Sequence, residues 1–140
     1  MAVLIKPKFN VSEVKKEIAD YKLKMLEKVV SILVSLADTI AEDLRTNADY
    51  VNHSYNLRSS SGTIVFRDGL IIHENFKLMG DGSEGLAKGK KVAEENVPPS
   101  GIGMMLIAGE DYASYVEAKD NKWVITGSSM MLARLLQGMV

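Results

Sequence analysis

The side chains that could carry chemistry in this chain are few and widely spaced. There are two histidines, His53 in a polar stretch and His73 in a β-branched run, and there is no cysteine. A catalytic or metal site needs several convergent groups, such as a nucleophile beside a base or ligands at fixed spacings. Neither histidine lies in a His-x-x-x-His or similar spacing. We therefore expect structural or surface histidines and neither a metal nor a cofactor.

Two further patterns resemble chemical sites, and each has a simpler explanation. Glu110 and Asp111 precede a predicted helical turn, where acids cap backbone N–H groups and favour the helix dipole. Glycines at 80, 82 and 85 suggest a phosphate loop, but they do not follow a buried strand and lack the Gly-Lys-Ser/Thr order. No catalytic grouping remains, and we expect a protein without enzymatic activity.

The charge balance argues against a nucleic-acid-binding domain. Seventeen basic residues face eighteen acidic ones, which gives a net charge of −1, whereas DNA-binding domains usually carry a basic excess. Lys88, Lys90 and Lys91 form a small basic cluster. We interpret this cluster as a solvated helix face; nonspecific contact with passing DNA is the alternative.

No stretch of the chain is apolar enough to suggest a membrane partner. The longest apolar stretch, Val29 to Ala41, is interrupted by polar residues and falls short of the roughly 20 residues that a membrane span needs. The N-terminal residues are charged too early for a signal peptide. We expect a soluble protein.

A long N-terminal helix is the clearest predicted element. The 140 residues fit one domain, 1–140. Between Pro7 and Gly62 the chain contains neither glycine nor proline. Asn10 followed by Glu13 predicts an N-cap, and the helix is expected over 11–48. Apolar residues recur there in steps of three and four: Val11, Val14, Ile18, Tyr21, Met25, Val29, Ile32, Leu36, Ile40 and Leu44. In its second half the helix is apolar around most of its circumference, which indicates burial on more than one side.

A sheet region is predicted over 57–127. The runs Thr63–Arg67 and Leu70–Glu74 flank Asp68-Gly69, which is a strong signal for a β-hairpin with a type I′ turn. Regular pairing would put Ile64, Phe66, Ile71 and His73 on one face and Thr63, Val65 and Ile72 on the other. Because both faces hold large apolar residues, we expect both to be covered. Ile102–Ala108 is a continuous apolar run and is predicted as a central strand, and Trp123–Thr126 as the last strand.

Three shorter helices complete the predicted fold. Glu84–Asn96 contains two interior glycines, each costing about 1 kcal/mol relative to alanine, so this helix should depend on packing. A short helix is expected over Tyr112–Lys119, and a C-terminal helix capped by Ser128 over 128–140. The order predicts an α+β fold in which the long helix packs on a mixed, mainly antiparallel sheet.

The predicted long helix exceeds the size of the domain. It would be about 57 Å long at roughly 1.5 Å per residue, whereas a compact domain of this chain length has a diameter of roughly 37 Å. It must therefore bend or project beyond its own subunit. Projection would leave Val14, Ile18, Tyr21 and Met25 in water, so we expect these residues to contact a neighbouring chain.

Two segments resemble a known family. Tyr55–Gly69 (YNLRSSSGTIVFRDG) and Ala108–Thr126 (AGEDYASYVEAKDNKWVIT) are similar to the tail-component family of long-tailed bacteriophages, the tail-completion or head–tail joining (neck) proteins. The first family motif matches Leu57-Arg58-Ser59-Ser60, and the second matches Tyr112-Ala113, Tyr115-Val116-Glu117 and Lys119. Two positions depart from it: Ser54-Tyr55-Asn56 stands where the family often has Thr-Gly, and Asp120-Asn121 replaces a glycine.

The resemblance implies a structural subunit without catalytic residues. It implies a homo-oligomeric ring, a hexamer or dodecamer, that joins tail to head in the virion, contacts other neck or tail proteins and is assembled in the host bacterial cytoplasm. Within the matched segments, Arg58 and Glu117 would be paired polar anchors, with Tyr112 and Tyr115 packing beneath them. We expect all four residues to belong to the contacts between subunits. Two alternatives stay open from the residues themselves: a small α+β binding or adaptor module of a bacterial operon, and a small enzyme.

Overall fold

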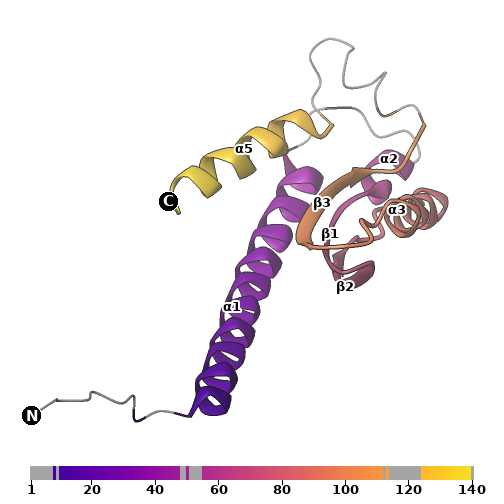
Figure 1. Ribbon diagram of the computed structural model, residues 1–140. Helices are drawn as coiled ribbons and strands as arrows, with labels where there is room; N and C mark the ends of the chain where they lie inside the picture. The colour runs from indigo at the N-terminus through magenta and orange to yellow at the C-terminus, as the bar shows by residue number, and fades with distance from the viewer. Residues whose placement is uncertain are drawn as a thin grey trace, which may run out of the picture.

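The part of the chain that the structure describes forms a long helix, a three-stranded antiparallel sheet and three shorter helices, seen in the computed structural model of Figure 1. The structure describes residues 8, 10–47, 50, 55–111, 113 and 124–139. The α+β fold is as predicted. The elements in chain order are α1 (Val11–Thr46), α2 (Asn56–Ser60), β1 (Ser61–Arg67), β2 (Leu70–Asn75), α3 (Ser83–Glu95), β3 (Ile102–Ala108) and α5 (Thr126–Gln137).

Helix α1 begins where the sequence predicts and projects away from the sheet. The Asn10 side chain accepts a hydrogen bond from the Ser12 N–H at 2.9 Å, which caps the helix. The helix ends at Thr46, two residues before the predicted end, with Asn47 as its C-cap. Its 36 residues span about 54 Å at roughly 1.5 Å per residue. Its buried residues all lie in its last third: Leu36, Ala37, Ile40, Ala41, Leu44 and Arg45. The rest of the helix extends beyond the globule (Figure 1).

The hairpin turns at Asp68-Gly69, as predicted. Both residues have positive φ, 47° and 83°, the conformation that a type I′ turn requires. The register shifts by one residue beyond the turn, because Phe66 pairs with Ile71 while Val65 pairs with His73. This bulge reverses the alternation of side chains along β2. The prediction that His73 shares a face with Ile64 was therefore wrong; His73 lies opposite Val65, on the face towards α1.

Strand β1 is the central strand of the sheet, whose order is β2-β1-β3. The prediction of Ile102–Ala108 as a central strand was wrong, because β3 lies at an edge. Its apolar run has another cause: α1 and α3 lie on opposite faces of the sheet. The Thr63 hydroxyl donates to the Ala37 carbonyl of α1 at 2.7 Å. On the other face a buried cluster joins the sheet to α3 through Ile64, Phe66, Ile107 and Ala93.

Close packing against α2 explains the glycines of α3. A Cβ atom at Gly85 would overlap the Asn56 carbonyl, and one at Gly89 would overlap the Ser60 carbonyl. The predicted helix forms, and the backbone contact that needs these glycines compensates their low helix propensity. Helix α2 itself was not predicted, since its five residues were interpreted only as the segment entering the hairpin.

The C-terminal region differs from the prediction. Val124 and Ile125 are bends and Thr126 begins α5, so the predicted strand Trp123–Thr126 is absent from its described part; Trp123 lies outside the described residues. The N-cap of α5 is Ile125 rather than Ser128, and the Ser128 hydroxyl donates to Asp43 of α1. The predicted short helix Tyr112–Lys119 lies outside the described residues except for Ala113.

Replacing Gly69 with valine should destabilise the fold by about 1–3 kcal/mol, the cost of a strained backbone position. A Cβ at Gly69 would meet only ordinary van der Waals neighbours, so the cost should come from the positive φ, which a β-branched residue tolerates poorly. The matched control is Gly69→Asn, because asparagine visits this region more readily. Urea denaturation of both variants measures the effect, and equal stability of the two would show that φ does not determine it.

Candidate functional site

The most exposed apolar surface lies on the outer part of α1. We call Val11–Ser35 the shaft; every one of these residues is described, and none is buried. Its exposed apolar side chains are Val11, Ile18, Tyr21, Leu23, Met25, Val29 and Ile32. A helix in water normally exposes polar residues on its free sides. The shaft therefore carries more apolar surface than an isolated projection needs.

Most of these side chains lie along one side of the shaft. Val14, Ile18, Tyr21, Met25, Val29 and Ile32 follow each other in steps of three and four, which places them above one another on a helix. We call this set the apolar stripe. Ile18 is 51% exposed, Tyr21 65% and Met25 42%, and Val14 is half-buried. The structure thus brings the four predicted contact residues of the helix together, outside the subunit's own core.

The apolar stripe leads into a groove between α1 and α5. Ile32 and Leu36 line the groove from α1, and Leu135 and Met139 line it from the end of α5 and the residues after it. Ser31, Ser35 and Thr39 complete the lining, and the groove has a volume of about 340 Å³. The groove is mainly apolar and holds no charged residue. Its composition suits a hydrophobic side chain or helix rather than a polar substrate.

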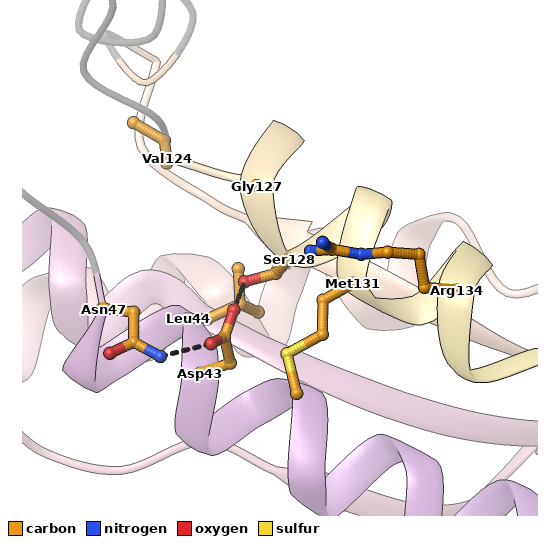
Figure 2. A pocket seen from close by; sticks show the side chains of 8 residues that line it. All are labelled: Asp43, Leu44, Asn47, Val124, Gly127, Ser128, Met131 and Arg134. Atoms are coloured by element: carbon orange, nitrogen blue, oxygen red, sulfur yellow. Dashed lines mark hydrogen bonds between the residues drawn. The ribbon is translucent and has the colours of Figure 1, made fainter.

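The other end of α5 is attached to α1 through Asp43 (Figure 2). The Ser128 hydroxyl donates to one carboxylate oxygen of Asp43 at 2.6 Å, and the Asn47 amide donates to the other. A small pocket of about 210 Å³ lies beside this joint, with Met131 and Arg134 of α5 in its lining. A single carboxylate that is already hydrogen-bonded on both oxygens is a structural tie. The joint sets the position of α5 against α1.

Arg58 lies inside the subunit, beside the C-terminal end of α1. It is 8% exposed, it donates to the Arg45 carbonyl, and its guanidinium lies 4.9 Å from the centre of the Tyr50 ring. A carbonyl at a helix end and an aromatic face are both favourable partners for a buried cation. Arg58 thus holds the segment after α1 to the end of that helix. Its expected partner Glu117, with Tyr112 and Tyr115, lies outside the described residues.

The serines of the matched motif are buried and hydrogen-bonded. Ser59 donates to the Met79 carbonyl and accepts from the Met79 N–H. Ser60 and Ser61 both donate to the Leu57 carbonyl, at 2.8 and 2.9 Å. Buried hydroxyls need such partners because an unpaired one is costly. Neither periodicity nor composition predicted that this polar run enters the core.

His73 pairs with a carboxylate of α1. Its Nε2 lies 2.7 Å from Asp38 Oδ1, and the Asn75 amide donates to the same oxygen at 2.7 Å. The hydrogen bond from His73 lowers the pKa of Asp38 below its ordinary value, and the Asn75 amide contributes in the same direction. These contacts hold β2 against α1. His73 therefore has a structural contact, one of the two roles predicted for it. His53 lies outside the described residues.

The basic cluster on α3 is matched by carboxylates. Lys88 bonds to the buried Glu110 at 2.9 Å, and this bond raises the pKa of Lys88. Lys90 lies 3.5 Å from Glu74, and Lys91 lies 3.8 Å from Glu95. A phosphate backbone binds to uncompensated positive charge. In this cluster the neighbouring carboxylates compensate the charge of the lysines.

Within the part of the chain that the structure describes, no three His, Asp or Glu side chains gather as metal ligands would. In that same part, no helix has the length and apolar character of a membrane span. Comparison of the chain with protein-family models, with curated proteins and with solved structures gives no match. The surface formed by the shaft and the α1–α5 groove is the candidate functional site, because it combines the exposed apolar side chains of α1 with an apolar groove.

Replacing Asp38 with asparagine should cost about 0.5–1 kcal/mol at pH 7, because the tie to His73 is partly exposed. The folded-state pKa of Asp38 is lowered, so the carboxylate stabilises the fold above its unfolded pKa of about 3.9. This contribution disappears as the pH falls through the lower folded value. Thermal unfolding should show the gap between the two proteins narrowing as the pH falls below about 3.9. Asp20→Asn on the exposed shaft is the control, and a gap that does not narrow in acid would contradict the assignment.

Proposed function

We propose that this protein is a non-enzymatic structural subunit of a bacteriophage neck, a tail-completion protein that forms a homo-oligomeric ring joining tail to head. The observation that carries the proposal is the apolar stripe on a helix that projects from its own subunit. The resemblance of Tyr55–Gly69 and Ala108–Thr126 to the tail-component family supplies the phage context. In this proposal the protein works in the virion and is assembled in the host cytoplasm.

The energetics favour a covered shaft. Full burial of a large apolar side chain is worth about 1.5–3 kcal/mol. The stripe has six such residues, and covering the exposed half of each would contribute on the order of 5 kcal/mol per subunit on this scale. A gain of this size exceeds what a scattered surface leucine or valine provides, and in this proposal another copy of the chain supplies it.

The arrangement of the apolar surfaces suits a ring better than a closed pair. A ring needs two different surfaces on each subunit, because each subunit contacts its two neighbours through unlike faces. The stripe is convex and lies on the free shaft, whereas the α1–α5 groove is concave and lies near the globule; the two surfaces share Ile32. A shaft from one copy in the groove of the next would repeat around a ring of six or twelve subunits.

The contacts of the chemically capable side chains support a structural role. His73 and Asp38 join β2 to α1, Glu110 is paired with Lys88, and Asp43 joins α1 to α5. Each group holds two elements of the fold together. The proposed partners are copies of the chain and other neck or tail proteins, with at most nonspecific contact with the passing DNA.

Introducing charge on the stripe should block assembly while the subunit stays folded. Ile18→Asp with Met25→Asp places two carboxylates on the proposed contact. Light scattering after size exclusion should show smaller particles than the unaltered chain forms, and the melting temperature of the monomer should change little because neither residue is buried.

The matched control is Leu23→Asp. Leu23 is 50% exposed on the same shaft, but it lies about 140° around the helix from Ile18, at 3.6 residues per turn. This variant should assemble normally. A folded Ile18/Met25 variant that still assembles would overturn the role of the stripe. An unaltered chain that stays monomeric at high concentration would favour the adaptor-module alternative.

A further inference from the structure

Strand β3 forms an edge of the sheet among the described residues. In the described sheet β3 pairs only with β1, and Figure 1 shows it as the outermost strand on its side. Such an edge offers a row of free backbone groups to another strand. Proteins usually protect an edge with charges, proline or a bulge. The seven residues of β3, IGMMLIA, contain no charge and no proline, and their pairing with β1 shows no bulge.

The pairing pattern identifies which backbone groups face outward. At the two ends of the β1–β3 ladder, the Gly109 N–H donates to Ser60 and the Asp68 N–H donates to Gly101. Hydrogen-bonded pairs alternate along antiparallel strands. The odd-numbered residues of β3 therefore bond to β1, and the N–H and C=O groups of Ile102, Met104 and Leu106 point to the open edge.

The opposite edge differs in each of these respects. Strand β2 carries His73 and Glu74 and has a bulge between its pairing partners Ile71 and His73. Both features hinder pairing with a further strand. The sheet thus has one protected edge and one open edge, and only β3 offers a regular ladder.

The sequence before α1 contains a segment suited to this edge. Ala2-Val3-Leu4-Ile5 is an uncharged apolar run ending at Lys6-Pro7, and its β-branched residues favour a strand. Proline removes a ladder donor and so marks where such a strand would end. We call residues 2–5 the arm.

The arm cannot reach the middle of β3 in its own chain. Ala37 of α1 touches Thr63, which lies opposite Leu106 in the sheet. Ala37 lies about 39 Å along the helix from Val11, at roughly 1.5 Å per residue. The nine residue steps from Ala2 to Val11 span at most about 32 Å when fully extended. The arm therefore falls short of the middle of its own β3.

We infer that the arm of one subunit adds as a strand to the β3 edge of a neighbouring copy, so that each subunit of the assembly lends a strand to the next. This inference rests on the proposed self-assembly and specifies its contact. Strand addition provides backbone hydrogen bonds together with pockets for alternate side chains. It would also fix the direction of the ring, since the arm and β3 are different surfaces.

Cysteine cross-linking tests this contact, because the chain has no cysteine of its own. One chain carries Leu4→Cys, a second and differently tagged chain carries Leu106→Cys, and the two are co-expressed and treated with a short bismaleimide. We expect a cross-linked dimer containing one chain of each kind. Each variant alone is the control, and neither should cross-link.

The outcomes separate this inference from the proposed function. Particles that assemble without the mixed cross-link would overturn strand addition and leave the ring standing. Cross-linking of the Leu106→Cys chain to itself would show symmetric β3 pairing and would also overturn it. A mixed cross-link in a particle no larger than a dimer would support strand addition and contradict the ring. A protein that stays monomeric would overturn both.

A second variant tests the backbone contact directly. Met104→Pro removes an outward N–H but no bond to β1, so it should be tolerated as proline is on edge strands. Met104→Ala keeps the N–H and shortens the same side chain. We expect the alanine variant to keep the mixed cross-link and the proline variant to lose most of it at an unchanged circular dichroism spectrum. Equal cross-linking in the two folded variants would contradict a strand at this edge.

Discussion

The structure depends on one mismatch of size: α1 is far longer than the sheet that it packs against. Only residues from Leu36 onwards are buried, so about two thirds of the helix has no core of its own. A free helix in water is marginally stable unless an amphipathic face is covered. The apolar stripe shows which side of the shaft has a face to cover. The proposal that a neighbouring chain covers the shaft rests on the length of the helix and on its pattern of apolar residues, independently of any chemical group.

The inner end of α1 is held by directional contacts that fix where the shaft points. Thr63 bonds to the Ala37 carbonyl, His73 and Asn75 bond to Asp38, and Arg58 bonds to the Arg45 carbonyl. These contacts come from β1, β2 and α2, so they hold the helix from several directions. Apolar packing alone would allow the helix to slide or rotate, whereas hydrogen bonds require one geometry. A subunit that must present its shaft at a fixed angle to a neighbour benefits from such an attachment.

The sequence predicted the elements with strong local signals and missed those decided by tertiary contacts. The Asn10 cap, the Asp68-Gly69 turn and the apolar periodicity of α1 are local features, and each appears where expected. The prediction of the sheet face on which His73 lies was wrong, because the bulge in β2 leaves no local sign in the sequence. Thr126 belongs to α5 rather than to a strand. The next turn of this helix is held by the bond from Ser128 to Asp43, a residue distant in sequence. The position of β3 at an edge could not be predicted, since burial between two helices produces the same apolar run as a central strand. Of the candidate site, periodicity and length alone identified Val14, Ile18, Tyr21 and Met25, but the α1–α5 groove depends on a packing angle that no pattern encodes.

The most direct measurement of the central claim is hydrogen exchange along α1 as a function of protein concentration. Amides near the buried end, around Ile40 and Leu44, should be protected at every concentration because the subunit's own sheet covers them. Amides from Ile18 to Val29 should exchange quickly in dilute monomer and become protected in parallel with the appearance of larger particles. This result would show that a neighbouring chain covers the shaft. Protection of Ile18–Val29 that is already complete in the monomer, or fast exchange that persists in the assembled particle, would contradict the account.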